Sequence, residues 1–183
     1  MKKIVLSMIL ALALLLPCSA LAQTYTFDGV FTMEYPDEWY YVEDSEEPTE
    51  TIIGLGLLAG KGARDLNIQM DMRYYKDWSD WTLYNLSEEE MDHYIEVLLY
   101  DHSEYDAELV EVITSDADGL SFVIIRGVDS YGDYFYAETM ARGWSFGFNG
   151  YAFKNSDYDS CRDLTDRDYE LFVEIIRSFT AIR

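Results

Sequence analysis

A G-x-S-x-G pattern, which surrounds the nucleophile of many serine hydrolases, occurs at residues 143–147. In those enzymes the serine lies at a sharp turn between a strand and a helix, and the acid and the histidine of the triad follow it in the chain. Here aromatic and small residues alternate, as in a β-strand, and both histidines, His93 and His102, precede Ser145. The segment is therefore predicted to be a strand whose small residues admit a neighbouring element.

A second glycine pattern, at residues 54–59, fits a degenerate dinucleotide fingerprint, G-x-G-x-x-A. That fingerprint must open a helix whose N-terminus holds the pyrophosphate. The next residues, 60–62, are Gly-Lys-Gly, which do not start a helix. We therefore predict no nucleotide site and expect no cofactor.

The histidines and a group of aspartates are the residues of this chain that could ligate a metal ion. His93 and His102 do not form the i, i+4 pair of zinc-binding helices, and we expect both on an exposed surface. A hard cation such as calcium could be gathered by Asp157, Asp159, Asp163, Asp166 and Asp168. An EF-hand loop needs glycine at its sixth position and glutamate at its twelfth, where this chain has Arg162 and Asp168. We favour a solvated start of a helix over a calcium site and predict no metal ligand.

Aromatic residues are abundant, with 16 tyrosines and 4 tryptophans. They are enriched in binding patches because they offer a large contact area at a small entropy cost, but they also fill cores between helices and sheets. One group precedes the first predicted helix and another lies at a predicted hairpin. The candidate ligand patch drawn from both groups comprises Tyr74, Trp78, Trp81, Tyr84, Tyr131 and Tyr134. The sequence leaves core and binding surface as open alternatives.

Residues 1–22 have the features of a cleavable signal peptide. A short basic start precedes an apolar segment at residues 4–16, and Ala20 and Ala22 supply small residues at the two positions that determine cleavage. The apolar segment is shorter than the ~20 residues that span a bilayer as a helix. We expect secretion of a mature chain that starts at Gln23.

The chain has 2 cysteines. A lipoprotein signal that acylates Cys18 is the less favoured alternative for the leader, because Pro17 stands where such signals need a small residue. After cleavage only Cys161 remains, which is either shielded or available for a bond between chains. Residues 23–183 are long enough to bury a core without a disulfide or a metal, and we expect them to form a single domain.

The formal net charge of −22 restricts the partners. Repulsion from phosphate makes nucleic acid and an anionic membrane surface poor partners. Such acidity keeps a secreted protein soluble and favours cations or basic proteins. We expect no membrane span in the mature chain and, as a partner, another extracellular or envelope protein. The oligomeric state is left open.

Hydrophobic periodicity places two helices among a series of strands. A capping box at Ser87 and Glu90 starts the first helix, and Thr165 with Asp168 starts the second in the same way. Expected strands cover residues 31–35, 40–42, 51–59, 66–75, 107–114, 120–128, 134–142 and 144–153. Short turns join the later strands, which should form an antiparallel meander. The predicted class is α+β: a central antiparallel β-sheet of about seven strands with helices packed on it as an α/β/α sandwich.

Three features of these elements resemble the PsbP/Mog-like family. They are a Tyr-Pro-x-x-Trp ending of the first strand at residues 35–39, a meander with a glycine turn at residues 119–153, and a last helix that runs into Ser178-Phe179. Members of the family include extrinsic subunits of photosystem II, a Ran-binding nuclear import factor and many secreted bacterial domains. The resemblance implies a central antiparallel sheet between helical layers and a tendency toward binding or assembly. No functional residue of the family maps onto this chain.

The resulting hypothesis is a secreted, non-catalytic binding or assembly module of unknown ligand. One alternative is a carboxylate-dependent hydrolase acting on an extracellular substrate, whose paired acids only geometry reveals. The other is a calcium-stabilised extracellular domain. We predict no catalytic residue.

Overall fold

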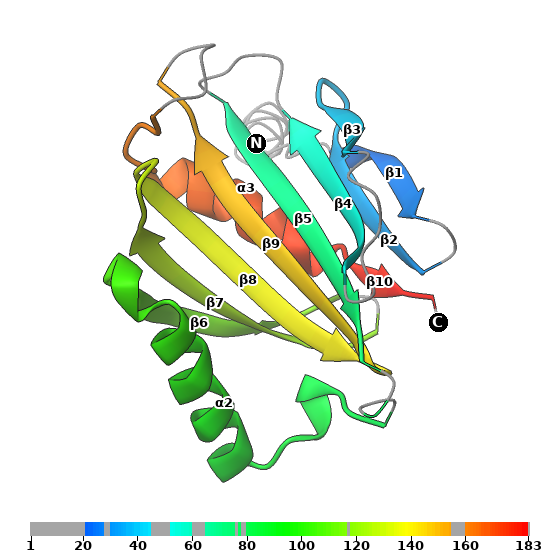
Figure 1. Cartoon of the computed structure of the whole chain (residues 1–183). Helices are drawn as coiled ribbons and strands as arrows, with labels where there is room; N and C mark the ends of the chain where they lie inside the picture. The colour runs from blue at the N-terminus through cyan, green and yellow to red at the C-terminus, as the bar shows by residue number, and fades with distance from the viewer. Residues whose placement is uncertain are drawn as a thin grey trace, which may run out of the picture.

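The computed structural model describes residues 21–27, 30–44, 52–59, 65–75, 77, 80–116, 118–154 and 160–182. Its strands are β1 (Leu21–Phe27), β2 (Phe31–Pro36), β3 (Tyr40–Asp44), β4 (Ile52–Ala59), β5 (Leu66–Tyr74), β6 (Glu108–Thr114), β7 (Ser121–Val128), β8 (Asp133–Ala141), β9 (Trp144–Ala152) and β10 (Thr180–Ala181). Its helices are α2 (Glu88–Asp101) and α3 (Asp166–Arg177), with the 3-10 turns η2 (Leu83–Asn85) and η3 (Ser103–Tyr105). In Figure 1, α3 passes behind β5 and β9, while α2 stands beside β6 and β7. Within the described ranges, no helix has both the length and the apolar character needed to cross a membrane.

The strands form two antiparallel sheets. The larger has the order β3-β4-β5-β9-β8-β7-β6 and the smaller the order β1-β2-β10. The predicted meander is present as β6 to β9, in which each strand pairs with the next. The α+β class is therefore confirmed. The expectation of one single sheet is wrong, because β2 pairs with β1 and with β10 at the far end of the chain, and neither of these strands was predicted.

One face of the larger sheet packs on α3 and on the smaller sheet. Alternation along β5 buries four side chains on this face: Leu66, Ile68, Met70 and Met72. Phe179, just after α3, is fully buried. Its ring contacts the rings of Phe31, Phe122, Phe146 and Phe148. Burial of one phenylalanine contributes about 1.5–3 kcal/mol, so this cluster joins both sheets to the end of the helix.

The opposite face of the larger sheet packs on α2. Leu98 is the buried residue of this helix, and it packs with Val123 and Ile125 of β7. The predicted capping box is present: the Ser87 N–H donates to Glu90 Oε2 at 2.8 Å, and the Glu90 N–H donates to Ser87 Oγ at 3.3 Å. Helices thus lie on both faces of the larger sheet, and α2 buries less of itself than α3 does.

Candidate functional site

The tip of the β8–β9 hairpin holds two other chain segments beside it. Arg142 and Gly143 at the tip both have positive φ, 55° and 84°, as tight two-residue hairpin turns require. The Tyr75 N–H donates to the Gly143 carbonyl at 2.7 Å, and the Arg142 N–H donates to the Trp81 carbonyl at 3.1 Å. The chain that leads into η2 is thereby fixed next to the end of β5.

Four aromatic residues belong to the segments that meet at this hairpin tip. We call the following four residues the aromatic end: Tyr74, Trp81, Tyr84 and Trp144. The Tyr74 ring lies against the Trp144 ring with centroids 5.1 Å apart. Tyr74, Trp81 and Tyr84 are exposed, whereas Trp144 is partly buried. Exposed aromatic groups of this kind are typical of binding surfaces.

The remaining members of the predicted ligand patch do not join the aromatic end. Tyr131 is exposed but precedes β8, whose 9 residues separate it from the hairpin tip, a distance of about 30 Å at ~3.3 Å per residue. Tyr134 is 2% exposed, and its hydroxyl shares a hydrogen bond of 2.8 Å with His102 Nδ1. Tyr134 therefore does not contribute to an exposed patch, because it lies on the face of β8 that packs toward α2. Trp78 lies outside the described residues.

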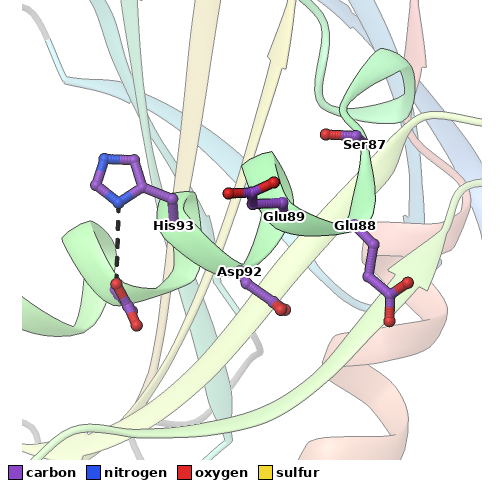
Figure 2. Close-up of a pocket in the computed structure, with 6 residues that line it drawn as sticks. Ser87, Glu88, Glu89, Asp92 and His93 are labelled. Carbon is purple, nitrogen blue, oxygen red and sulfur yellow. Dashed lines mark ion pairs between the residues drawn. The ribbon is translucent and has the colours of Figure 1, made fainter.

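The outer face of α2 is acidic. Figure 2 shows Glu88, Glu89 and Asp92 projecting outward in different directions rather than toward a common point. His93 on the same face is exposed, as expected, and its Nδ1 lies 3.9 Å from a carboxylate oxygen of Glu96. This shallow surface is a solvated helix face with favourable acids in its first turn.

His102 differs from the expectation of an exposed histidine. It is half-buried, and its ring centroid lies 4.8 Å from that of Tyr136. Burial lowers the pKa of His102, although the charge of Asp101 opposes this. His102 is half-buried because the chain turns at the end of α2, and this turn directs the side chain back toward β8.

A group of polar residues that the sequence did not single out lies on the α2 side of the larger sheet. Glu138 on β8 and Asp71 on β5 both stand opposite Gly147 on β9. Neighbouring strands are about 4.8 Å apart, so two acidic residues flank one glycine across three adjacent strands. We call the following residues the carboxylate cluster: Asp71, Arg73, Tyr94, Tyr136 and Glu138.

Gly147 leaves the space in which these side chains meet. A β-carbon on residue 147 would lie 2.3 Å from Asp71 Oδ1 and 2.8 Å from the Tyr136 hydroxyl oxygen. The Tyr136 hydroxyl donates to Glu138 Oε2 at 2.5 Å, and the Tyr94 hydroxyl donates to Glu138 Oε1. A single tyrosine hydroxyl thus neighbours both carboxyl groups, and α2 supplies a second one.

The two acids of the carboxylate cluster have different surroundings. Burial raises the pKa of Glu138; the tyrosine hydrogen bonds oppose this shift and the charge of Asp71 adds to it. Asp71 is partly exposed, and its Oδ2 lies 3.5 Å from Nη2 of Arg73. Burial also raises the pKa of Tyr136 and so keeps its hydroxyl protonated. Two acids in unlike environments are the arrangement that general acid–base catalysis uses, so the cluster has components for proton transfer.

The hydrolase-like pattern at residues 143–147 is strand from Trp144 onward, as predicted, whereas Gly143 belongs to the hairpin turn. Ser145 stands opposite Arg73 in the β5–β9 ladder. The pattern does not supply a nucleophile; its last residue, Gly147, leaves the space in which the carboxylate cluster lies. A sequence signal for this cluster exists in β8, where Glu138 follows four consecutive apolar or aromatic residues, Tyr134 to Ala137. It shares a face with Tyr136 because side chains two residues apart in a strand point the same way.

The aspartates considered for calcium are only partly described. Asp168 accepts hydrogen bonds from both terminal nitrogens of Arg162 at 2.7 Å each and one from the Thr165 N–H at 2.8 Å. Burial alone would raise the pKa of Asp168, but these hydrogen bonds lower it to about 2. Arg162, at the position where a calcium loop has glycine, thus supplies a cation itself. Asp157 and Asp159 lie outside the described residues, and within the described part no acids, histidines or cysteines gather as a metal site would need.

Cys161 is buried. It packs against the loop before β8, where a β-carbon on Gly132 would lie 3.1 Å from Cys161 Cβ. Burial raises the pKa of Cys161 to about 11. Of the two alternatives for this thiol, the structure therefore favours shielding over a bond between chains.

Comparison with known proteins identifies the fold. No protein-family model matches the chain, and no curated protein matches it. Among solved structures, it is similar to cyanobacterial PsbP (CyanoP) from Synechocystis sp. PCC 6803, with 19% sequence identity and a TM-score of 0.53 over 91% of this chain and 98% of that chain. The chain therefore has the PsbP-like fold that its motifs predicted.

Proposed function

We propose that this chain is a non-catalytic binding or assembly module that acts outside the cytoplasm. The observation that carries the proposal is the aromatic end, where Tyr74, Trp81 and Tyr84 are exposed around a hairpin tip. Binding residues are often placed on loops that a rigid scaffold positions. The PsbP-like fold supports the proposal by analogy alone, since a fold can carry many functions.

The aromatic end is suited to binding because its backbone is already fixed. The Trp81 carbonyl accepts a hydrogen bond from the Arg142 N–H, so the backbone that carries this ring would lose little conformational entropy in a complex. The exposed Arg142 side chain adds a positive charge at this end of a chain whose net charge is −22. The exposed rings favour a ligand with flat or apolar groups, such as a sugar chain or a peptide.

Substitution of Trp81 tests the proposal. We expect the mature chain to bind a member of a panel of glycans and peptides, measured by calorimetry, and Trp81→Ala to weaken that binding at least about tenfold. Tyr131→Ala is the matched control, because Tyr131 is similarly exposed, 53% against 47%, but lies beyond the other end of β8. Absence of any bound panel member, or equal weakening by both substitutions, would contradict a binding role for the aromatic end.

The proposal that the chain acts outside the cytoplasm rests on the signal-like features of residues 1–22, and the strand pairing of β1 supports it. The pairing of β1 with β2 is regular from Gln23 to Phe27, and the register shifts between Leu21 and Gln23. Cleavage after Ala22 would therefore keep the regular part of this ladder in residues 23–183, which we propose form one domain. N-terminal sequencing of the exported protein should start at Gln23. An uncleaved leader, or a chain that starts with acylated Cys18, would contradict this assignment.

A carboxylate-dependent hydrolase acting on an extracellular substrate is the second candidate, and the carboxylate cluster is the observation that favours it. Glu138, with its raised pKa, would serve as the general acid, and Asp71 would serve as the base or nucleophile. Against this, both oxygens of Glu138 accept hydrogen bonds from tyrosines, and Tyr94 approaches it from α2. A substrate would have to displace that contact, so binding remains our first proposal.

The two candidates are separated by a screen of ester, glycoside and peptide substrates. The hydrolase candidate predicts an activity that Glu138→Gln and Asp71→Asn each abolish while Trp81→Ala leaves it measurable. Ser145→Ala is the control for a serine mechanism. If no substrate is cleaved, or if cleavage survives both carboxylate substitutions, the second candidate is eliminated.

A further inference from the structure

The strand β6 forms one edge of the larger sheet (Figure 1). It has 7 residues and pairs with β7 alone among the strands described. Natural edge strands are commonly protected from further pairing by charged side chains, especially lysine, by proline, by β-bulges or by short length. β6 has neither lysine nor proline. It does contain one bulge, at Val110, which disturbs the first part of the strand and leaves Glu111–Thr114 regular.

The two faces of β6 differ in chemistry. Leu109 and Val112 stand opposite Ile125 and Val123, so they lie on the α2 side of the sheet. They are 41% and 42% exposed, which is unusual for apolar residues of a strand that borders a core. This side therefore offers an apolar row to anything that pairs with the edge.

The α3 side of β6 carries carboxylates. Glu108 and Glu111 stand opposite Arg126 and Ile124, and Glu111 accepts a hydrogen bond of 2.5 Å from the Tyr169 hydroxyl. Both glutamates are exposed. A strand added at this edge would therefore meet apolar residues on one side and acids on the other.

The backbone groups available for such pairing follow from the phase of the β6–β7 ladder. The Ser115 N–H donates to the Leu120 carbonyl at 2.8 Å, which makes these two residues a directly bonded pair. In an antiparallel ladder bonded pairs recur every second residue, so Ile113 and Glu111 are directed toward β7. Val112 and Thr114 consequently direct their N–H and C=O groups away from β7, toward the edge that no described strand covers.

We propose that the edge of β6 binds an extended segment of a partner polypeptide in which basic and apolar residues alternate. Such a segment adds a strand to the sheet through the backbone groups of Val112 and Thr114. Its apolar side chains contact Leu109 and Val112, and its basic side chains pair with Glu108 and Glu111. This inference names a partner chemistry that the proposed binding role leaves open, and it concerns a surface separate from the aromatic end.

A second copy of this chain fits the edge less well than a basic partner. Two β6 strands related by a two-fold axis would place the Glu108 and Glu111 row of one copy opposite the same row of the other. Like charges directly opposite each other destabilise a strand pair, and the net charge of −22 on each chain adds long-range repulsion. The same charge attracts a basic segment and speeds its association at low salt.

A synthetic peptide tests the proposal with the mature chain. The probe is a capped peptide of alternating lysine and valine, about as long as β6, and the control probes are the glutamate–valine peptide and an N-methylated lysine–valine peptide that cannot pair as a strand. We expect saturable binding of the first probe by calorimetry, weakened by salt, and binding at least about tenfold weaker for both control probes. No binding of the first probe, or equal binding of the N-methylated peptide, would overturn the proposal.

Substitutions in β6 locate the binding. Val112→Pro removes an outward N–H, which an edge strand tolerates, and should weaken binding of the lysine–valine peptide at least about tenfold. Val112→Thr is the matched control that keeps the N–H. Glu111→Gln should weaken binding a few-fold and reduce its salt dependence. If Val112→Pro does not fold, the N-methylated peptide still shows, with the unmodified chain, whether the peptide binds by strand pairing. If all three variants bind the lysine–valine peptide like the unmodified chain, β6 is not the binding site.

Discussion

The Tyr94 hydroxyl of α2 donates a hydrogen bond to Oε1 of Glu138 on β8, and this bond joins the helix to a buried carboxyl group of the larger sheet. Within α2 only Leu98 is buried. Met91, Ile95 and Leu99 of the same helix pack on the core while only partly buried, so the Tyr94 hydrogen bond adds a polar contact to this apolar packing. The carboxylate cluster therefore has a structural role whether or not it also performs chemistry.

Removal of the Glu138 carboxyl group should destabilise the protein. Glu138→Ala takes the acceptor away from the hydroxyls of Tyr94 and Tyr136, and an unsatisfied buried polar group costs about 1–3 kcal/mol. We expect a loss of about 2–4 kcal/mol in the free energy of unfolding, measured by urea titration. Glu138→Gln keeps a polar partner and should cost less. The exposed Glu89→Ala serves as control and should stay within ~0.5 kcal/mol.

Glu138 should also make stability depend on pH. Burial raises its pKa above the ordinary value of 4.5, so the folded chain retains a proton that the unfolded chain releases. Stability from this group is therefore fully present below pH 4.5 and is lost as the pH rises toward the folded pKa. Across that window Glu138→Gln should become more favourable relative to the unmodified chain. Parallel curves of unfolding free energy against pH for the two proteins would show that Glu138 does not titrate differently on folding.

The absence of a side chain at residue 147 should be essential to the carboxylate cluster. In Gly147→Ala the new β-carbon would lie 2.3 Å from Asp71 Oδ1, so Asp71 must move, and overpacking of this kind costs about 1–3 kcal/mol. The penalty should shrink when Asp71→Ala is combined with Gly147→Ala. A double-mutant cycle of unfolding free energies measures this coupling, and additive effects would argue against the contact.

Local patterns in the sequence identify most of the elements. The capping boxes at Ser87 and Thr165 lie where they were predicted, because their bonds join residues three positions apart. The meander from β6 to β9 follows from short turns between neighbouring strands. The smaller sheet could not be predicted in this way, since β2 and β10 are separated by almost the whole chain.

The candidate sites depend on register between distant strands, which a single sequence does not contain. Asp71 and Glu138 become neighbours only because β5 and β8 both pair with β9 at Gly147. Tyr131 and Tyr134 looked equivalent in the sequence, yet one lies in an exposed turn and the other on a buried face. Composition shows that aromatic residues are in excess, but only the fold separates the exposed ones from the core.

The Arg162–Asp168 pair should govern stability in acid. The pKa of Asp168 is lowered to about 2 from 3.8, so its contribution is present above pH 3.8 and is lost as the pH falls toward 2. Asp168→Asn should cost about 1–2 kcal/mol of unfolding free energy at pH 7, and the difference from the unmodified chain should narrow below pH 3.8. Urea titrations of both proteins at pH 7 and at a pH below 3.8 measure the two differences. A difference that stays constant down to pH 2 would mean that the pair contributes through packing alone.

Phe179 should be the most sensitive apolar position near the C-terminus of α3. It is fully buried among four phenylalanine rings that come from both sheets, and large-to-small substitution of a core phenylalanine costs about 3–5 kcal/mol. Phe179→Ala should lower the free energy of unfolding by that amount, while Tyr100→Ala on the exposed face of α2 should change it by less than ~0.5 kcal/mol. Because Phe179 contacts Phe31 of the smaller sheet, removal of the Phe179 ring should also weaken the packing of the β1–β2–β10 sheet. Amide hydrogen exchange should then quicken in β2 before it quickens in β8, and uniform quickening across both sheets would show that they unfold as one unit.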